Sequence, residues 1–201
     1  MDDQSLVEAW RAGDRQAGEA LFRRHFQSVT RFFRNKFSAG IDDLVQQTFI
    51  ALLEGRERLA SGANVRSYLF GIAHNVMRAN LRALAKQRAF DPAASAIVDL
   101  DPSPSTMVGQ CQEQRLLLLA LRRIPIEAQV TLELVYWEQL NAAEIAEILG
   151  VPHSTMRSRI QRARQLLRQA IEGLGESPAL IVSTLGGLDD WALAVRKANP
   201  A

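Results

Sequence analysis

The chain has 201 residues, of which 47% are hydrophobic and 23% charged, and its formal net charge is +2 at pH 7. This length suffices for one large domain or for two small ones, each with a buried core. The lone Cys111 excludes a disulfide framework within the chain, and no stretch approaches the roughly 18 to 20 apolar residues of a membrane span, so we expect a soluble cytoplasmic protein.

Four helical patterns precede residue 91. Hydrophobic periodicity predicts helices over residues 5–12, 15–37, 41–57 and 65–88. Asp42 and Asp43 open the third pattern, where negative charge complements the helix dipole. The predicted buried stripe of this helix consists of Leu44, Val45, Phe49, Leu52 and Leu53.

The fourth helical pattern is basic and aromatic. Between residues 66 and 88 it has five basic side chains and no acidic one, together with Tyr68 and Phe70. Gly71 in its middle costs about 1 kcal/mol relative to alanine, which indicates a packing or close-approach constraint. Cations interleaved with aromatic rings suit single-stranded nucleic acid, because unstacked bases can lie on the rings. The alternative is that Tyr68 and Phe70 are core residues and the cations form a solvated rim.

Residues 91–112 have three prolines, three aspartates and no hydrophobic periodicity, which predicts a flexible linker. Helical patterns resume over residues 113–123 and 127–138. Because no convincing alternating strand pattern occurs, the expected fold class is all-α, with two small helical domains joined by this linker.

Two further helical patterns between Asn141 and Arg168 meet at a glycine. The apolar residues that share one face of the first are Ile145, Ile148 and Leu149. Gly150 follows where a helix ends in a left-handed turn, and Ser154 is the expected N-cap of the second helix. The inward stripe of that second helix consists of Met156, Ile160, Ala163 and Leu167. The pattern predicts a helix-turn-helix whose recognition helix comes second.

The outward face of this recognition helix is strongly basic. Residues 154–168 include five arginines and no acidic residue. The outward positions include Thr155, Arg157, Ser158, Gln161, Arg162 and Arg164. Such a mixture can bond base edges and neutralise phosphates. The alternative is an ordinary helical hairpin with solvated arginines, although solvated faces normally mix both charge signs.

Charge is distributed unevenly along the chain. Residues 1–90 have 14 basic and 9 acidic side chains, residues 91–150 have 3 and 9, and residues 151–172 have 5 and 1. Basic segments on either side of an acidic middle indicate two segments that face nucleic acid and a central stretch that avoids it.

These segments together resemble the extracytoplasmic-function (ECF) RNA polymerase sigma factors. The resemblance covers residues 5–172 and is carried by DDLVQQTFIALLE, VRSYLFGIAHNVMRANLR and the hairpin, in that order. It implies a bacterial RNA polymerase specificity subunit that performs no chemistry, directs core polymerase to promoters and assists promoter melting. The domain that binds polymerase and the minus-ten element would span residues 1–90, and the domain that binds the minus-thirty-five element would span 113–172.

The resemblance also implies roles for individual residues. The family's DLVQE-like helix binds core polymerase and maps to Asp43, Gln46 and Gln47, with Gln47 where glutamate is usual. The expected contacts to the melted non-template strand are Tyr68, Asn75, Arg78 and Arg82. The expected contacts to duplex DNA at the minus-thirty-five element are Thr155, Arg157, Ser158, Gln161 and Arg162. An anti-sigma factor is a further expected partner.

Two other functions stay open at this point. The main alternative is a free-standing helix-turn-helix transcriptional regulator, and a second is an adaptor whose first domain only binds a protein. The basic aromatic helix speaks against both. An enzyme is disfavoured because no nucleophile–base pair or glycine-rich phosphate loop is present. His25, His74 and His153 have no zinc-ligand spacing, so no metal or cofactor is expected.

Residues 173–201 form a short extension beyond the resemblance. They are too apolar for a solvated tail and contain Pro178 and the pair Gly186-Gly187, so one or two short helices are expected. The extension either covers part of the second domain or acts as a regulatory segment.

Overall fold

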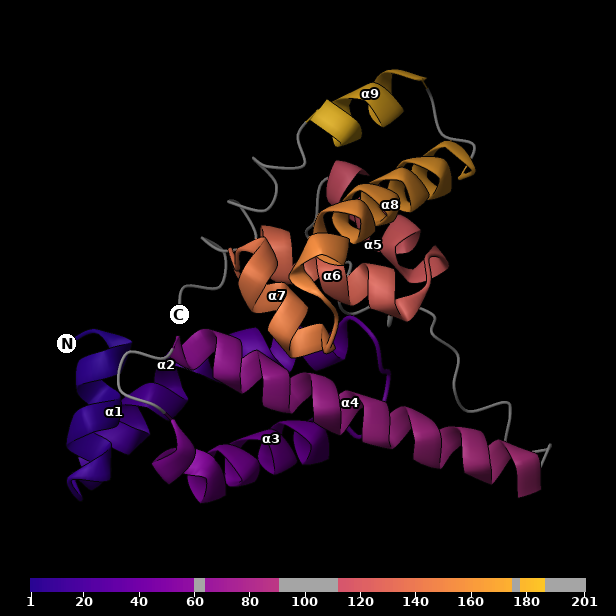
Figure 1. Ribbon diagram of the computed structural model, residues 1–201. Coiled ribbons are helices and arrows are strands. Elements are labelled where there is room, and N and C mark those ends of the chain that lie inside the picture. Colours follow the sequence, from indigo (N-terminus) through magenta and orange to yellow (C-terminus); the bar gives the residue numbers. More distant parts are fainter. Residues whose placement is uncertain (60–63, 91–111, 175–177, 187–201) are drawn as a thin grey trace. The chain divides into compact units, whose positions relative to one another are not determined.

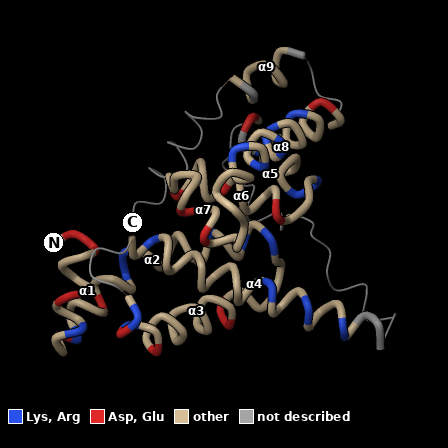
Figure 2. Tube along the Cα trace, in the orientation of Figure 1, with Lys and Arg blue, Asp and Glu red and all other residues tan. Residues whose placement is uncertain are grey.

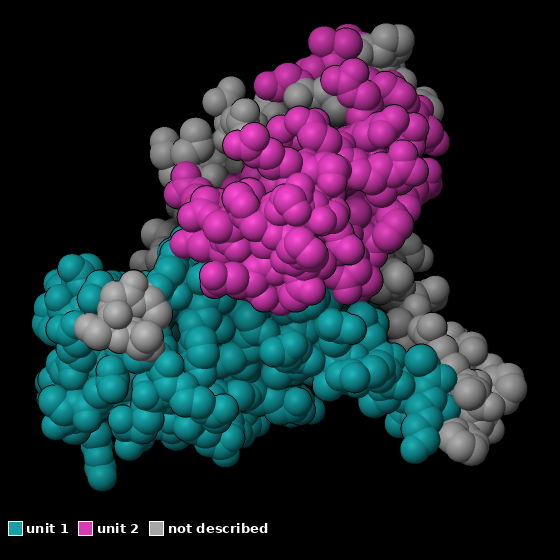
Figure 3. Space-filling model, viewed as in Figure 1, with its two compact units in different colours: residues 1–99, 201 teal, residues 100–200 magenta. Residues whose placement is uncertain are grey.

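The computed structural model describes residues 1–59, 64–90, 112–174 and 178–186. Within these ranges it contains nine α-helices, one short 3-10 helix and no strand, so the all-α expectation is confirmed. The described residues up to 90 belong to one compact unit and those from 112 onward to a second (Figure 3). Apart from Gln112, the expected linker lies outside the described residues.

Unit 1 comprises four α-helices and one 3-10 turn (Figure 1). They are α1 (Asp3–Arg11), α2 (Arg15–Arg34), α3 (Ile41–Gly55), η1 (Arg56–Arg58) and α4 (Val65–Phe90). Asp2 accepts a hydrogen bond from the backbone N–H of Ser5, and Asp14 accepts from those of Gln16 and Ala17. The Asp2 cap explains why α1 begins at Asp3, two residues earlier than the apolar pattern predicts, and the Asp14 cap fixes the start of α2 at Arg15.

The end of α2 is the main difference in helix boundaries within unit 1. The periodicity predicts helix to Phe37, but α2 ends at Arg34. The backbone N–H groups of Lys36 and Phe37 both bond to the carbonyl of Phe33 and close a turn. The buried Lys36 ammonium donates to the carbonyl of Phe32 at 2.7 Å and lies 3.8 Å from the centre of its ring. Backbone and side chain thus satisfy the terminal carbonyls, and Phe37 stays buried.

The core of unit 1 lies where α2, α3 and α4 meet. Its largest fully buried side chains are Leu21, Phe33, Leu59, Leu69, Phe70 and Met77. The Phe32 and Phe70 rings pack edge to face with their centroids 5.6 Å apart. Of the two aromatic residues that could either bind bases or belong to the core, Phe70 is therefore a core residue. Tyr68 is only half-buried.

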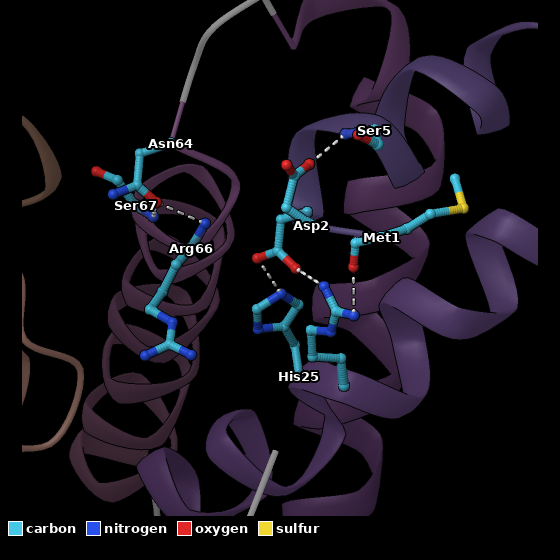
Figure 4. A network of polar contacts seen from close by, with 9 residues as sticks. Met1, Asp2, Ser5, His25, Asn64, Arg66 and Ser67 are labelled. Carbon is cyan, nitrogen blue, oxygen red and sulfur yellow. Dashed lines mark hydrogen bonds and ion pairs between the residues drawn. The ribbon is translucent and has the colours of Figure 1, made fainter.

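A polar network joins α1 to α2 (Figure 4). The Asp3 carboxylate accepts hydrogen bonds from Arg24 at 2.6 Å and from Nε2 of the fully buried His25 at 2.8 Å. Arg24 also donates to the carbonyl of Met1 at 2.9 Å. The hydrogen bond from His25, and then Arg24, outweigh partial burial and lower the pKa of Asp3 to about 2.

Unit 2 comprises five helices. They are α5 (Gln112–Arg123), α6 (Ile126–Tyr136), α7 (Ala142–Leu149), α8 (His153–Glu172) and α9 (Pro178–Gly186). The central hydrophobic cluster consists of Leu116, Leu117, Ala120, Leu121, Ile124, Leu132, Trp137, Ala163, Leu167 and Ile171. A capping box starts α7, because Asn141 accepts from the N–H of Glu144 while the Glu144 carboxylate accepts from the N–H of Asn141.

The turn between α7 and α8 has the geometry expected from the glycine. Gly150 lies in the left-handed region with φ of 64°, and its N–H bonds to the last carbonyls of α7. The prediction that Ser154 caps α8 is wrong, because α8 begins at His153 after Pro152 and has no side-chain cap. The fixed φ of proline favours a helix start without a capping side chain. The predicted inward stripe is confirmed, with Met156, Ala163 and Leu167 buried and Ile160 half-buried.

The described part of the C-terminal extension is α9, which packs mainly on α5 and also contacts α8. Leu180 and Ile181 contact the central cluster of unit 2, and the Ser183 hydroxyl bonds to the Glu113 carboxylate at 3.1 Å. A short helix that covers the second unit was one of the two expectations for this extension. The remaining residues 187–201 lie outside the described residues.

Within the described ranges, no helix combines the length and the apolar character needed to cross a membrane.

Candidate nucleic-acid and partner interface

The recognition helix α8 presents a polar face opposite its buried stripe. Arg157, Ser158, Gln161 and Arg162 are exposed, and Thr155 is half-buried in the first turn. Figure 2 shows the basic residues distributed along this helix. At helical spacing, Ser158 and Gln161 point away from Met156 and Ala163, with arginines on both sides. This order places hydrogen-bonding groups between cations, as simultaneous contact with base edges and flanking phosphates requires.

Short-range bonds orient part of this face before any ligand binds. The Ser158 hydroxyl donates to the carbonyl of Thr155 at 2.7 Å, which leaves its oxygen free to accept. Arg162 donates to Gln165 at 3.3 Å, and the Arg164 guanidinium lies 5.5 Å from the centre of the Tyr136 ring. Arg157 and Gln161 are exposed side chains of the same face.

Helix α4 presents a second basic face. The described side chains exposed on it include Asn75, Arg78, Arg82 and Lys86. Tyr68, seven residues before Asn75, lies on the same face at helical spacing and is held by a hydrogen bond from its hydroxyl to the carbonyl of Gly55 at 3.3 Å. The opposite face is buried through Leu69, Phe70, Ala73 and Met77. All four residues predicted to contact single-stranded DNA therefore share one side of α4.

The beginning of α4 is fixed by a side-chain cap. The Asn64 carbonyl oxygen accepts from the backbone N–H groups of Arg66 and Ser67 at 3.0 and 3.2 Å (Figure 4). Helix α4 contains no acidic residue over its length. Its polar face therefore has a single sign of charge, which favours a polyanion.

The predicted polymerase-binding residues lie on α3. Asp43, Gln46 and Gln47 are all exposed and occupy one side of the helix, while Leu44, Val45 and Leu52 are buried on the other. The prediction that Leu53 belongs to the buried stripe is wrong, because its side chain is 47% exposed. Leu53 lies seven residues after Gln46 and thus on the same exposed side of α3.

An apolar groove adjoins this face. It has a volume of about 570 Å³ and lies between α2 and α3, with Trp10 of α1 also in its wall. The other apolar residues that line it include Phe22, Phe26, Phe49, Ile50 and Leu53. Phe22, Ile50 and Leu53 are 40%, 46% and 47% exposed. Asp42 and Gln46 add polar groups from α3 to the lining. A concentration of exposed large apolar side chains in one groove marks an interaction surface.

The sequence reasoning missed this groove. Phe22 and Phe26 stand four residues apart, beside the main apolar stripe of α2, and this second row was the available signal. Nothing in the sequence indicates that Trp10 lines a groove, because the position of its side chain depends on tertiary packing against Gly18. A Cβ atom added at Gly18 would lie 2.5 Å from the Trp10 indole nitrogen, so only glycine allows this contact without a shift.

In the described part of the chain, no cluster of three or more His, Cys, Asp or Glu side chains is arranged to hold a metal ion.

Comparison with known families gives two matches along the chain. Residues 21–87 match the model of Sigma-70 region 2, and residues 114–167 match that of Sigma-70, region 4. The sequence is 30% identical over 171 residues to the ECF RNA polymerase sigma factor SigM of Mycobacterium tuberculosis, covering 84% of each chain. It is 27% identical to the ECF RNA polymerase sigma-E factor of Haemophilus influenzae, covering 87% of this chain and 97% of the relative.

Two solved structures have a similar fold. The sigma factor RpoE from Bartonella quintana, solved in complex with the anti-sigma factor NepR, aligns with a TM-score of 0.62 at 19% identity, covering 77% of this chain and 96% of that one. CnrH, solved in complex with the cytosolic domain of CnrY, aligns with a TM-score of 0.61 at 21% identity, covering 87% and 99%.

Proposed function

Because the chain belongs to the ECF family of RNA polymerase sigma factors, which direct core polymerase to promoters, we propose how its two units divide that task. Unit 1, residues 1–90, binds core polymerase and the melted minus-ten element. Within unit 2, residues 113–172 bind the duplex minus-thirty-five element. The observation that carries this division is the pair of basic helix faces, one on α4 and one on α8, in a chain that matches both sigma regions in order.

The α8 face contacts duplex DNA. Arg157, Ser158, Gln161 and Arg162 contact base edges and the adjoining backbone in the major groove, and Thr155 lies near a phosphate at the start of the helix. The exposure of these side chains, and the hydroxyl oriented by Thr155, support this role.

The α4 face binds the separated non-template strand. Tyr68 offers a ring on which a base can stack, Asn75 borders the position of an extruded base, and Arg78 and Arg82 neutralise phosphates. Base extrusion costs a few kcal/mol, and stacking at about 1 to 3 kcal/mol per base offsets it together with the phosphate contacts. Binding energy drives melting in this scheme, and the chain itself performs no chemistry.

The α3 face binds core polymerase. Asp43, Gln46 and Gln47 supply polar contacts, and the neighbouring groove receives apolar side chains of the polymerase. The exposure of Phe22, Ile50 and Leu53 supports this assignment, because leaving them in water is unfavourable unless a partner covers them. Gln47 keeps hydrogen-bonding capacity without the charge of the usual glutamate.

An anti-sigma factor is the second protein partner that we propose. Two proteins of similar fold were solved as complexes with such factors or with a cytosolic domain of a partner. A partner that covers the α3 face and its groove would block core polymerase by occupying the same exposed apolar residues.

The polymerase-binding surface can be tested by direct binding to purified core polymerase. We expect the double variant Asp43→Ala, Gln46→Ala to bind about tenfold more weakly, a loss of about 1.4 kcal/mol. Glu147→Ala is a matched control, because it removes an exposed helical carboxylate from unit 2. Circular dichroism checks that helicity is retained. Equal affinity of the double variant and the control would remove α3 from the interface.

A further inference from the structure

Gly71 lies in the interior of α4, where glycine destabilises a helix relative to alanine. Its conformation does not explain its presence, because no positive φ is found there. Two other helical glycines of unit 1 are explained by packing. A Cβ added at Gly18 would overlap the Trp10 ring, and one added at Gly55 would overlap the Tyr68 hydroxyl.

Packing does not explain Gly71. A Cβ added there would have no atom of another described element within 4 Å. The position is open space on the protein side. Alanine would therefore fit without a shift and would strengthen the helix.

The position of Gly71 on α4 supplies a reason. Gly71 is three residues after Tyr68 and four before Asn75, so it lies directly between these two side chains on one face. Arg78 and Arg82 continue the same face and are exposed. The missing side chain thus leaves a flat, bare stretch of helix backbone inside the basic face.

We propose that this bare stretch is a close-approach site for a single DNA strand. The strand lies against the backbone of α4 at Gly71, with a base held between Tyr68 and Asn75 and the following phosphates on Arg78 and Arg82. Charge complementarity selects this occupant, because α4 has no acidic residue. Any side chain at position 71 would hold the strand away from the helix. This inference rests on the proposed function of α4 and names a residue that sets how closely the strand approaches.

The test combines folding stability and strand binding in the full chain. The probe is a labelled oligo(dT) strand of about 16 nucleotides, followed by fluorescence anisotropy at fixed salt. Gly71→Ala should unfold at an equal or higher temperature than the wild type yet bind about tenfold more weakly. Gly71→Leu should abolish measurable binding, because its bulk keeps the strand away from the helix. Leucine is a good helix former, so a loss of binding would not come from a weakened helix. Ala83→Leu, which adds the same bulk at an exposed position to one side of this face, should bind like the wild type.

The outcomes separate the inference from the function on which it rests. If the double variant Arg78→Ala, Arg82→Ala loses binding while Gly71→Ala and Gly71→Leu bind like the wild type, the α4 face binds DNA but the close-approach site is refuted. If the Gly71 variants lose binding and the arginine variants do not, the close-approach site holds and the cation roles are wrong. If neither the wild type nor any variant binds the strand, the inference and the strand-binding role of α4 both fail.

Discussion

Asp3 connects the N-terminal helix to the rest of unit 1. Its carboxylate bonds to Arg24 and to the buried His25 on α2, and these contacts lower its pKa to about 2 from an ordinary value of 3.8. The same helix, α1, supplies Trp10 to the groove beside α3. These partly buried polar contacts therefore hold α1, and with it part of the proposed polymerase-binding surface, against α2.

The lowered pKa of Asp3 predicts a pH-dependent contribution to stability. Because the folded-state pKa is depressed, the contribution is fully present above pH 3.8 and is lost as the pH falls toward 2. Asp3→Asn should lower the free energy of unfolding at pH 7 by about 1 to 2 kcal/mol, after allowance for partial solvent screening. Chemical denaturation of both proteins at a series of pH values measures this difference. A difference that stays constant from pH 7 down to pH 2 would contradict the ionic origin.

Single residues also show where sequence reasoning stops. The turn at Gly150 was predictable, because the left-handed conformation has a local cause. Residue type and spacing place Leu53 in the buried stripe, but the packing of the helices leaves its side chain 47% exposed. Serine is a favoured N-cap residue, which predicts a cap at Ser154. Helix α8 nevertheless begins at His153, because Pro152 precedes it and favours an earlier start of the helix. Gly71 stands out in the sequence because glycine destabilises a helix interior. Its location on the basic face follows from helical spacing alone.

At the scale of elements, α8 is the proposed reader of duplex DNA, and its order of cations and amides gives a direct test. Arg157→Ala should weaken binding to a specific duplex by about 1 to 3 kcal/mol, because a bidentate contact to a base is lost. Arg168→Ala, at an exposed position near the C-terminal end of the same helix, serves as control and should have a smaller effect. The measurement is anisotropy with a duplex selected from a random pool by the holoenzyme. Unchanged affinity of Arg157→Ala would remove this residue from the interface.

Helix α9 allows a second comparison at this scale. Ile181 contacts the core of unit 2, whereas the adjacent Val182 is 71% exposed. Ile181→Asp should lower the free energy of unfolding by about 1 to 3 kcal/mol, since a charge is placed against apolar side chains. Val182→Asp introduces the same residue on the outer side and should leave stability nearly unchanged. Thermal unfolding of both variants gives the answer, and equal melting temperatures would show that α9 does not cover the unit.

The helices themselves were largely predictable, and their ends were not. Apolar periodicity located every helix from α1 to α8, because each has one face that must be buried. The shifts at the start of α1 and the end of α2 come from Asp2 and from Lys36, whose polar contacts override the apolar pattern. The groove was hidden for a related reason, since Trp10, Phe22 and Leu53 meet only after three helices pack.

For the whole molecule, we expect that two units that each bind one DNA element, as proposed, gain affinity by being linked. Once one unit is bound, the second binds its own element at a raised effective concentration. In the proposed scheme, core polymerase adds a further attachment through the α3 face. We therefore expect that neither unit alone specifies a start site, and that the complete chain does so only together with core polymerase.

The most direct test is transcription in vitro from bare DNA of the source genome, with purified core bacterial polymerase and sequencing of the RNA 5′ ends. We predict a discrete set of start sites that appear only when the chain is added and that share two short upstream elements. Binding of the chain to duplex DNA without any new start site would contradict the sigma-factor role and would favour a free-standing helix-turn-helix regulator.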